Sequence, residues 1–297
     1  MQRHNITLTY KLQGLPQSMF HSIALVGGTH GNETSGIQLV RNWQQHGLPK
    51  RFSELNVSLQ IANKEALAAN VRFLEQDLNR QFTFDALAEN NIAKEAQLAK
   101  ALNEQLGPKG SSKTDLVIDI HNTTSAMGAT LIILEADEFH IQLARYVKHH
   151  MPEANILLED EKPYLEHGYL CTTGKKGVMI EVGAQPQGVL REDVYLLTQT
   201  MAEVILDFCI DYNKGNISTN SLPPCEVFRL GENVSFPLDE EGYRTAMIHH
   251  ALQDADFTPL LPGQPVFRTF DGKDIVWESS TETYPHFINE AAYFKLN

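Results

Sequence analysis

The feature of this sequence that most constrains its fold is a regular alternation of short, apolar, β-prone runs with longer stretches of helical periodicity. The expected strands cover residues 23–27, 56–61, 116–120, 130–134, 155–158 and 178–182. Several of them are continuously apolar, which is typical of strands that are covered on both faces of a sheet. The expected helices lie between or after them, at residues 33–45, 85–106, 137–151 and 192–212. This alternation predicts an α/β fold with a mixed, largely parallel sheet.

The pattern changes after residue 212. The stretch "NKGNISTNSLPP", residues 213–224, is rich in Gly, Asn, Ser and Pro and is typical of a linker. Short alternating runs and turn signals such as "LPGQP" and "FDGKD" follow it, without a long helical period. We therefore expect two domains, residues 1–213 with the α/β sheet and a smaller, β-rich domain of residues 214–297.

Charge and cysteine content limit the classes of partner. The chain has 24 basic and 37 acidic residues, a formal net charge of −13 and no basic tract, so we expect it to bind neither nucleic acid nor a membrane. We find neither the apolar block of a signal peptide nor an apolar run near the ~20 residues of a membrane span. Three cysteines without CxxC spacing indicate a reducing compartment, and hence a cytoplasmic protein.

Two stretches that follow expected strands carry candidate metal ligands. "GGTHGNETSG" places His30 and Glu33 three positions apart, after the first strand. "DIHNTT" places Asp119 and His121 two positions apart, and hence on one face, at the end of another strand. Two imidazoles and a carboxylate form a set that catalytic zinc uses, with one position open for water. Asp119 would accept a hydrogen bond from the free imidazole N–H of a ligand and so orient the ring. The alternative is a polar loop in which Glu33 merely starts a helix.

Glu181 is a candidate general base. In "KKGVMIEVGAQPQG" it lies at the end of an apolar strand, where partial burial would raise its pKa and suit it to proton transfer near neutral pH. The alternative is a structural ion pair between Glu181 and Lys175 or Lys176. Because chemistry in open α/β sheets collects at the carboxyl ends of strands, we expect Glu181 to lie close to the candidate metal ligands.

The segment "NVRFLEQDLNRQF" supplies Arg72, Asn79 and Arg80 within nine residues. Guanidinium groups pair with carboxylates and can stabilise an oxyanion, which an anionic ligand would require on so acidic a chain. The two arginines would converge if the segment folds back on itself. The alternative is surface ion pairing, the commoner fate of a single arginine.

Taken together, these stretches resemble the aspartoacylase family, zinc amidohydrolases related in their catalytic fold to zinc carboxypeptidases. The matching stretches are "GGTHGNETSG", "DLNRQF", "DIHNTTSAMGATLII", "IEVGAQPQGVLRED" and "FINEAAY". They occur in family order from residue 27 to residue 293 and so cover nearly the whole chain. The resemblance implies a zinc-carboxypeptidase-like catalytic domain, followed by a β-rich domain that narrows the channel to the metal.

The resemblance also assigns roles to residues. It implies one Zn²⁺ per subunit, held by His30, Glu33 and His121. It places Glu181 at the general base, which accepts a proton from the water that the metal activates.

The same resemblance assigns the substrate-binding residues. Arg72 falls at the arginine that helps polarise the scissile carbonyl. Asn79 and Arg80 match residues that hold the carboxylate end of the substrate. Tyr293, in "NEAAY", matches a tyrosine that the C-terminal domain contributes to the channel.

One family element differs in this chain. Animal aspartoacylases carry Tyr-x-x-x-Arg before the base, which helps to recognise the side-chain carboxylate of aspartate. In "YLCTTGKKG", Tyr169 matches that tyrosine and is followed by Thr173 in place of the arginine, in a segment two residues shorter. Lys175 or Lys176 is a candidate substitute, although lysine is not equivalent to arginine at a bidentate site.

These observations predict a zinc-dependent deacylase of anionic N-acyl-L-amino acids, with N-acetyl-L-aspartate as the favoured substrate. The alternatives are a deacylase for N-acetyl aromatic amino acids and mercapturates, or for N-succinylglutamate. A non-catalytic zinc- and ligand-binding protein is the alternative from another class. The family also allows a homo-oligomer.

Overall fold

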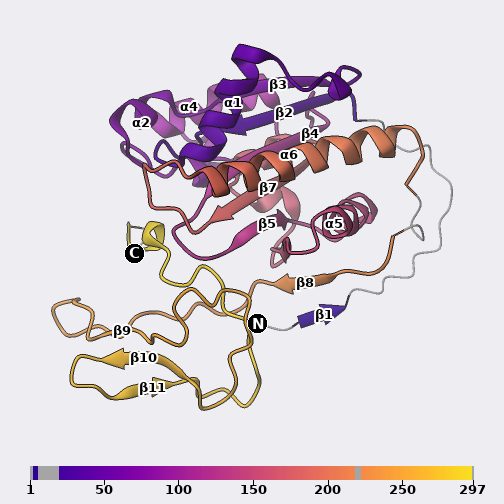
Figure 1. Ribbon diagram of the computed structural model, residues 1–297. Coiled ribbons are helices and arrows are strands. Elements are labelled where there is room, and N and C mark those ends of the chain that lie inside the picture. Colours follow the sequence, from indigo (N-terminus) through magenta and orange to yellow (C-terminus); the bar gives the residue numbers. More distant parts are fainter. Residues whose placement is uncertain (1–2, 6–19, 218–221, 296–297) are drawn as a thin grey trace.

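The computed structural model describes residues 3–5, 20–217 and 222–295, and most of its strands form one sheet of eight (Figure 1). The order across the sheet is β1-β8-β6-β5-β7-β4-β2-β3. In chain order the strands are β1 (Arg3–Asn5), β2 (Ser22–Gly27), β3 (Asn56–Ile61), β4 (Leu116–Asn122), β5 (Gly128–Ile133), β6 (Asn155–Leu158), β7 (Lys176–Gly183) and β8 (Glu226–Arg229).

The sheet is mixed and largely parallel, which confirms the predicted fold class. Five of its seven strand pairs are parallel, while β5 runs antiparallel to β7 and β1 runs antiparallel to β8. The three central strands β2, β4 and β7 are parallel neighbours, so their carboxyl ends meet at one edge. In this register Gly27 pairs with Ile120, and His121 pairs with Glu181. The topology therefore brings three expected site segments to one place.

Helices cover both faces of this sheet. They are α1 (Thr34–His46), α2 (Lys64–Ala69), α3 (Phe84–Ala88), α4 (Lys94–Leu106), α5 (Glu138–His150) and α6 (Glu192–Asn213). One core cluster joins α1, α5 and α6 to one face, and a second joins α4 to the other (Figure 1). Every residue of β4 is buried, Asp119 and His121 included, as expected for a central strand that is covered on both faces. None of these helices has the length and apolar character that crossing a bilayer requires.

The prediction of a single helix over residues 85–106 is wrong, because the chain forms two helices there, α3 and α4. Thr83 caps α3 by accepting a hydrogen bond from the Ala86 N–H, and the chain leaves the helical conformation at Glu89 (φ −63°, ψ 142°). The Asn91 side chain then accepts the Ala93 N–H at 3.0 Å. Asparagine side chains compete with helical hydrogen bonds in this way, so the pair "NN" separates α3 from α4.

The C-terminal part of the chain first extends the large sheet and then forms a small one. β8 pairs with β6, so this segment adds a strand to the main sheet. The second sheet, β9 (Ala246–Ile248), β10 (Pro265–Thr269) and β11 (Asp274–Val276), is antiparallel and has its own apolar cluster. Residues 218–221 of the expected linker lie outside the described residues. The boundary at residues 213 and 214 stays a prediction.

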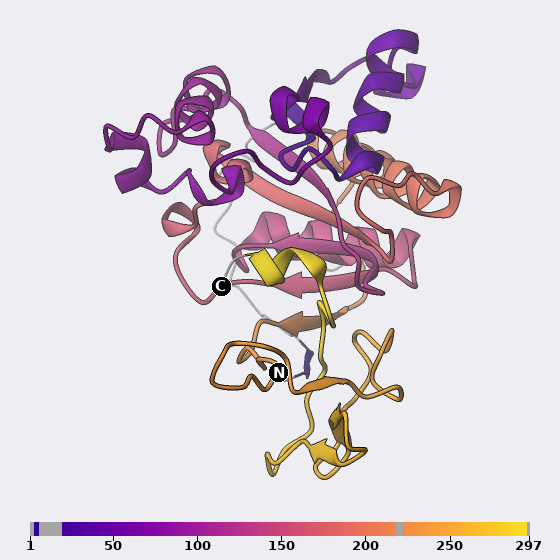
Figure 2. The ribbon, with the colours of Figure 1, turned by 90° about the vertical axis from the view of Figure 1, so that its left-hand side faces the viewer.

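After the small sheet the chain returns to the main one. Its last described element, the 3₁₀ helix η5 (Ala291–Lys295), lies beside the main sheet rather than beside β9–β11 (Figure 2). It reaches the edge at which β4 and β7 end (Figure 1). The C-terminal segment can therefore contribute side chains to a site at that edge.

Candidate active site

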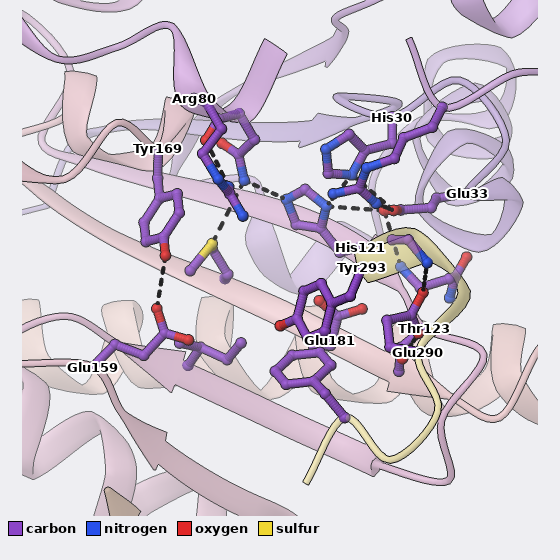
Figure 3. A pocket seen from close by; sticks show the side chains of 17 residues that line it. His30, Glu33, Arg80, His121, Thr123, Glu159, Tyr169, Glu181, Glu290 and Tyr293 are labelled. Atoms are coloured by element: carbon purple, nitrogen blue, oxygen red, sulfur yellow. Dashed lines mark hydrogen bonds and ion pairs between the residues drawn. The ribbon is translucent and has the colours of Figure 1, made fainter. Parts of the chain in front are cut away.

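The carboxyl ends of β2, β4 and β7 surround a pocket that the C-terminal segment closes on one side (Figure 3). Most of the residues singled out in the sequence line it. The lining comprises His30, Glu33, Arg72, Asn79, Arg80, His121, Asn122, Thr123, Ile132, Glu159, Tyr169, Met179, Glu181, Phe287, Glu290, Ala292 and Tyr293.

The three candidate metal ligands converge at the bottom of this pocket. The Nδ1 atom of His30 lies 2.7 Å from Oε1 of Glu33, and Nδ1 of His121 lies 2.9 Å from Oε2 of Glu33. The two Nδ1 atoms are 3.1 Å apart. All three side chains are buried, and each offers a ligand atom within 4.8 Å of the others.

Close backbone packing positions the loop that carries His30 and Glu33. A Cβ on Gly31 would lie 2.1 Å from the carbonyl carbon of Ala66, so only glycine fits between this loop and α2. Glu33 occupies the N-cap position of α1, in an extended conformation, and its side chain makes no cap hydrogen bond. Because Glu33 stays outside the helix, its carboxylate can point to the two imidazoles.

Each imidazole also has a carboxylate behind it. Nε2 of His121 lies 2.8 Å from Oδ2 of Asp119, whose Oδ1 accepts the Thr29 hydroxyl at 2.6 Å. Nε2 of His30 lies 3.0 Å from Oδ1 of Asp77. Such partners fix the ring orientation and leave Nδ1 free to bind a metal. Asp77 was not predicted as a site residue, although it belongs to the stretch "DLNRQF" and lies two positions before Asn79.

The electrostatics of the cluster fit a divalent cation. Burial alone would raise the pKa of Glu33, but the charges and hydrogen bonds of His30 and His121 hold it well below its usual range. Burial opposes the charge on His121, but Asp119 and Glu33 raise its pKa well above the usual value. The site therefore favours positive charge at this point, and two imidazoles with one carboxylate match the ligand set of catalytic zinc.

The carboxylates behind the rings lead to a prediction on metal affinity. We expect Asp119→Asn and Asp77→Asn each to weaken zinc binding about 10- to 100-fold, because each removes the anion that accepts the Nε2–H of a candidate ligand. Competition with a zinc chelator would measure this. Asp85→Asn, an exposed position on α3, is the matched control. Unchanged affinity in both variants would contradict the orienting role.

Arg72 lies between the candidate metal ligands and their supports. Its Nη1 donates to Oε1 of Glu33 at 3.0 Å, and its Nε donates to Oδ2 of Asp77 at 3.1 Å. Burial disfavours the charge of Arg72, but Glu33 and Asp77 offset this effect and raise its pKa. The guanidinium is thus held rigidly at the edge of the pocket, where a polarised carbonyl could approach it.

Glu181 lies near the end of β7, in register with His121 on β4. Its side chain faces the pocket from the side opposite His30 (Figure 3). Burial raises the pKa of Glu181 well above the usual range, Glu33 and Glu290 raise it further, and His121 and Arg72 oppose the rise. A carboxyl group whose pKa is raised in this way is suited to accept and return a proton.

Asn79 and Arg80 lie on the short helix η2 (Leu78–Arg80), and the two side chains differ in how they are engaged. Oδ1 of Asn79 accepts the Leu170 N–H at 2.8 Å, which ties η2 to the segment that carries Tyr169. The guanidinium of Arg80 lies 5.3 Å from the centre of the Tyr169 ring. Among the described residues no carboxylate forms an ion pair with Arg80 within 4.0 Å, so this cation is available to an anionic ligand.

The C-terminal segment is held to the loop after β4 by the carboxylate of Glu290, which was not predicted as a site residue. Oε2 of Glu290 accepts the Thr124 N–H at 2.7 Å and the hydroxyls of Thr123 and Thr124. Oε1 of Glu290 accepts the Ala292 N–H at 2.8 Å, at the start of η5. Glu290 thereby places Tyr293 on the pocket wall (Figure 3). Its position in "NEAAY", three residues before Tyr293, is the signal that could have identified it.

Loss of this anchor is expected to impair the enzyme without emptying the metal site. Glu290→Ala leaves the buried Thr123 hydroxyl and the part-buried Thr124 N–H without their acceptor, at a cost of about 1–3 kcal/mol. This corresponds to roughly 5- to 150-fold in kcat/KM if undocking of the C-terminal segment displaces Tyr293. Steady-state kinetics with metal analysis would measure this. Glu278→Ala, an exposed site in the same part of the chain, serves as control. Parental kinetics in Glu290→Ala would refute the anchoring role.

The two lysines considered as substitutes for the missing arginine do not reach the pocket, so that expectation is wrong. Lys176 begins β7, five positions before Glu181 and hence about 16 Å from it along the strand. Its Nζ bonds to Glu135 at 2.8 Å, and Lys175 Nζ bonds to Asp115 at 2.7 Å. The same ion pairs exclude the alternative in which either lysine neutralises Glu181.

Comparisons with known proteins agree with this arrangement. Residues 20–209 match the model of the succinylglutamate desuccinylase/aspartoacylase catalytic domain, and residues 223–297 match that of the AstE/AspA barrel-sandwich hybrid domain. Aspartoacylase from Danio rerio is 41% identical over 92% of this chain and 88% of its own length. N-acyl-aromatic-L-amino acid amidohydrolase (carboxylate-forming) from Rattus norvegicus is 37% identical over 92% of this chain and 87% of its own length.

Similarity extends to a solved structure. The crystal structure of murine aminoacylase 3 superposes with a TM-score of 0.83 at 34% sequence identity, covering 94% of this chain and 93% of that one. The likeness therefore includes both the main sheet and the C-terminal part of the chain.

Proposed function

This chain belongs to the succinylglutamate desuccinylase/aspartoacylase family, and we propose that it hydrolyses the amide bond of N-acyl-L-amino acids with the help of one bound Zn²⁺. The observation that carries the proposal is the convergence of His30, Glu33 and His121 in one pocket with Glu181 and Arg72. A protein that only stores zinc or binds a ligand needs neither a carboxyl group with a raised pKa nor a buried arginine beside the metal ligands.

The metal would be held by His30, Glu33 and His121. Zn²⁺ in such a site supplies a Lewis acid that polarises a carbonyl and lowers the pKa of a water molecule. Asp77 and Asp119 keep both imidazoles oriented, each through a hydrogen bond to Nε2.

Glu181 is the proton carrier in this mechanism. It accepts a proton from the water that attacks the amide carbonyl, and it returns that proton to the nitrogen of the departing amine. Arg72, held by Glu33 and Asp77, places positive charge beside the carbonyl oxygen as negative charge develops on it. The products are a carboxylic acid, acetate for an N-acetyl substrate, and a free amino acid.

Arg80 would bind the α-carboxylate of the substrate. It is exposed to the pocket and lies beside the Tyr169 ring. Asn79 supports this position through its hydrogen bond to the Leu170 N–H, and Tyr293 lines the wall across from it. An anionic N-acyl amino acid thus meets a local cation in an otherwise acidic protein.

N-acetyl-L-aspartate is the substrate that the sequence favours, and the relatives named aspartoacylase support it. An N-acyl aromatic amino acid is the second candidate. It is supported by relatives named for that activity, and by the pocket lining, in which Arg72 and Arg80 are the only arginines or lysines among the described residues. Similarity to succinylglutamate desuccinylase structures at 16% identity shows the fold alone.

A panel of N-acyl-L-amino acids would test the proposal, with amine release followed by NMR in the presence and absence of a zinc chelator. We expect release of free amino acid that the chelator abolishes and added Zn²⁺ restores. Ligand-induced stabilisation without product, across the whole panel, would favour the non-catalytic alternative. Turnover that resists complete removal of metal would contradict the role of Zn²⁺.

We also propose a cytoplasmic location and a small-molecule substrate, without nucleic acid or membrane partners. Three free cysteines support the reducing compartment, and the net charge of −13 supports the absence of polyanionic partners. A homo-oligomer stays a prediction from the family, which measurement of the mass in solution would test.

A further inference from the structure

A carboxyl group that the mechanism does not use lies in the wall of the pocket. Glu159 directly follows β6, and its backbone N–H donates to the Ile133 carbonyl at 2.9 Å. Only 6% of Glu159 is exposed, and its side chain lines the pocket across from Arg80. The Tyr169 hydroxyl donates to Oε2 of Glu159 at 3.1 Å (Figure 3). Glu159 therefore lies where the side chain of a bound amino acid would extend beyond Arg80.

The surroundings of Glu159 offer little compensation for a second negative charge. Tyr169, Arg80 and Tyr293 face it from the pocket, and Glu161 and Lys162 follow it in its own loop. Within the described part of the chain, no lysine or arginine forms an ion pair with Glu159 within 4.0 Å. Burial is the main reason that the pKa of Glu159 is raised, to about 7. Glu161 adds to the rise, whereas the Tyr169 hydroxyl, Arg80 and Lys162 oppose it.

Thr173 stands where the arginine that could have balanced a second substrate carboxylate would be expected. Thr173 is fully buried on η4 (Leu170–Thr173), and its hydroxyl donates to the Leu170 carbonyl at 2.9 Å, so it does not line the pocket. Lys175 and Lys176 form ion pairs with Asp115 and Glu135, outside the pocket. Arg72 is held by Glu33 and Asp77, which leaves Arg80 for the α-carboxylate.

We propose that Glu159 is the specificity-determining residue of the side-chain subsite, and that it selects N-acyl amino acids with an uncharged side chain over N-acyl aspartate. The inference rests on the proposed function and chooses between its two candidate substrate classes. A substrate side chain that is a carboxylate would bring a second negative charge against Glu159 in a poorly hydrated pocket. An aromatic or amide side chain meets no such repulsion and can pack on the rings of Tyr169 and Phe287.

The preference against N-acyl aspartate depends on pH. Because the pKa of Glu159 is raised to about 7, this preference should be stronger above pH 7 than below it. Below about pH 7 Glu159 is largely neutral and can share its proton with a substrate carboxylate. Above it Glu159 is ionised and repels that carboxylate. Two unit charges about 6–10 Å apart at an effective dielectric constant of about 20 discriminate by roughly 10- to 100-fold. The kcat/KM of N-acetyl-L-aspartate, relative to that of N-acetyl-L-asparagine or N-acetyl-L-phenylalanine, should therefore fall between pH 6 and pH 8.

The test compares these three substrates in the zinc-loaded, full-length protein. For the parent we expect the ratio of kcat/KM for N-acetyl-L-phenylalanine to that for N-acetyl-L-aspartate to exceed one at pH 8, and to be smaller at pH 6. Glu159→Gln should lower the ratio at pH 8 by at least about tenfold and remove its pH dependence. A ratio of two substrates cancels any general loss of folded enzyme. Glu166→Gln, an exposed position in the same loop region, is the matched control and should keep the parental ratio.

A second variant keeps the test informative if Glu159→Gln folds poorly. Tyr169→Phe removes a hydrogen bond that stabilises the ionised form of Glu159, so the pH at which the ratio changes should move upward. An unchanged ratio in Glu159→Gln, or a parent that prefers N-acetyl-L-aspartate at pH 8, would overturn this inference and leave the deacylase function intact. If the parent hydrolyses none of the three substrates, the proposed function itself fails.

Discussion

Glu181→Gln is expected to lower kcat by about 100- to 10,000-fold while leaving the zinc content of the purified protein unchanged. The amide has nearly the shape of the carboxyl group, so β7 and the neighbouring ligands should keep their positions. It cannot accept the proton of the attacking water or return one to the departing amine. The rate of amine release, measured together with the zinc content by elemental analysis, would test both parts of this expectation.

The comparison needs a control for the substitution itself. Glu153→Gln changes an exposed glutamate between α5 and β6 and should retain parental turnover. Substrate should still bind to the Glu181→Gln protein, which makes the variant suitable for trapping a complex with an intact amide. Turnover at the parental rate would remove Glu181 from the mechanism. Loss of zinc together with turnover would instead indicate that Glu181 supports the metal site.

His121→Ala is expected to remove both the metal and the activity. The substitution deletes one of the three ligands, and it leaves the fully buried Asp119 carboxylate facing a cavity instead of an imidazole. Loss of a Lewis acid that contributes several kcal/mol corresponds to a fall in kcat/KM of roughly 1,000-fold or more. Elemental analysis should show substoichiometric zinc, and thermal unfolding should begin at a lower temperature than in the parent.

Two comparisons separate metal loss from general damage. His46→Ala changes an exposed histidine in the last turn of α1 and should keep zinc and turnover. His30→Ala should lose zinc as His121→Ala does, because its Nδ1 shares Glu33 with that of His121. If the His121→Ala protein kept one tightly bound zinc and the parental activity, His121 would not be a ligand of the catalytic metal.

Much of the fold could be predicted because burial leaves a local pattern. The six expected strands are all present, and none of their ends differs by more than two residues from the prediction. Helix ends were less predictable where single side chains decide them, as the Asn91 side chain does between α3 and α4. The strands β1 and β8 were not predicted, since three- and four-residue strands have too few positions to show a period.

The candidate site divides in a similar way. His30, Glu33, His121 and Glu181 stood out because each is a polar residue at the end of an apolar run, and the parallel sheet brings such ends together. Asp77, Glu159 and Glu290 did not stand out. Their importance comes from contacts with His30, Tyr169 and Thr123, which lie 47, 10 and 167 positions away in the chain, respectively.

The sequence by itself therefore determined the α/β architecture, the family and the set of side chains that can hold a metal and move a proton, because hydrophobic period and motif order are local properties of a chain. Only the tertiary structure decided that Asp77 orients the His30 imidazole, that Lys175 and Lys176 form ion pairs outside the pocket, and that Glu159 lies in its wall. Those facts depend on distances between residues far apart in the chain. Charge and burial at such distances set the substrate preference, and no local pattern records them.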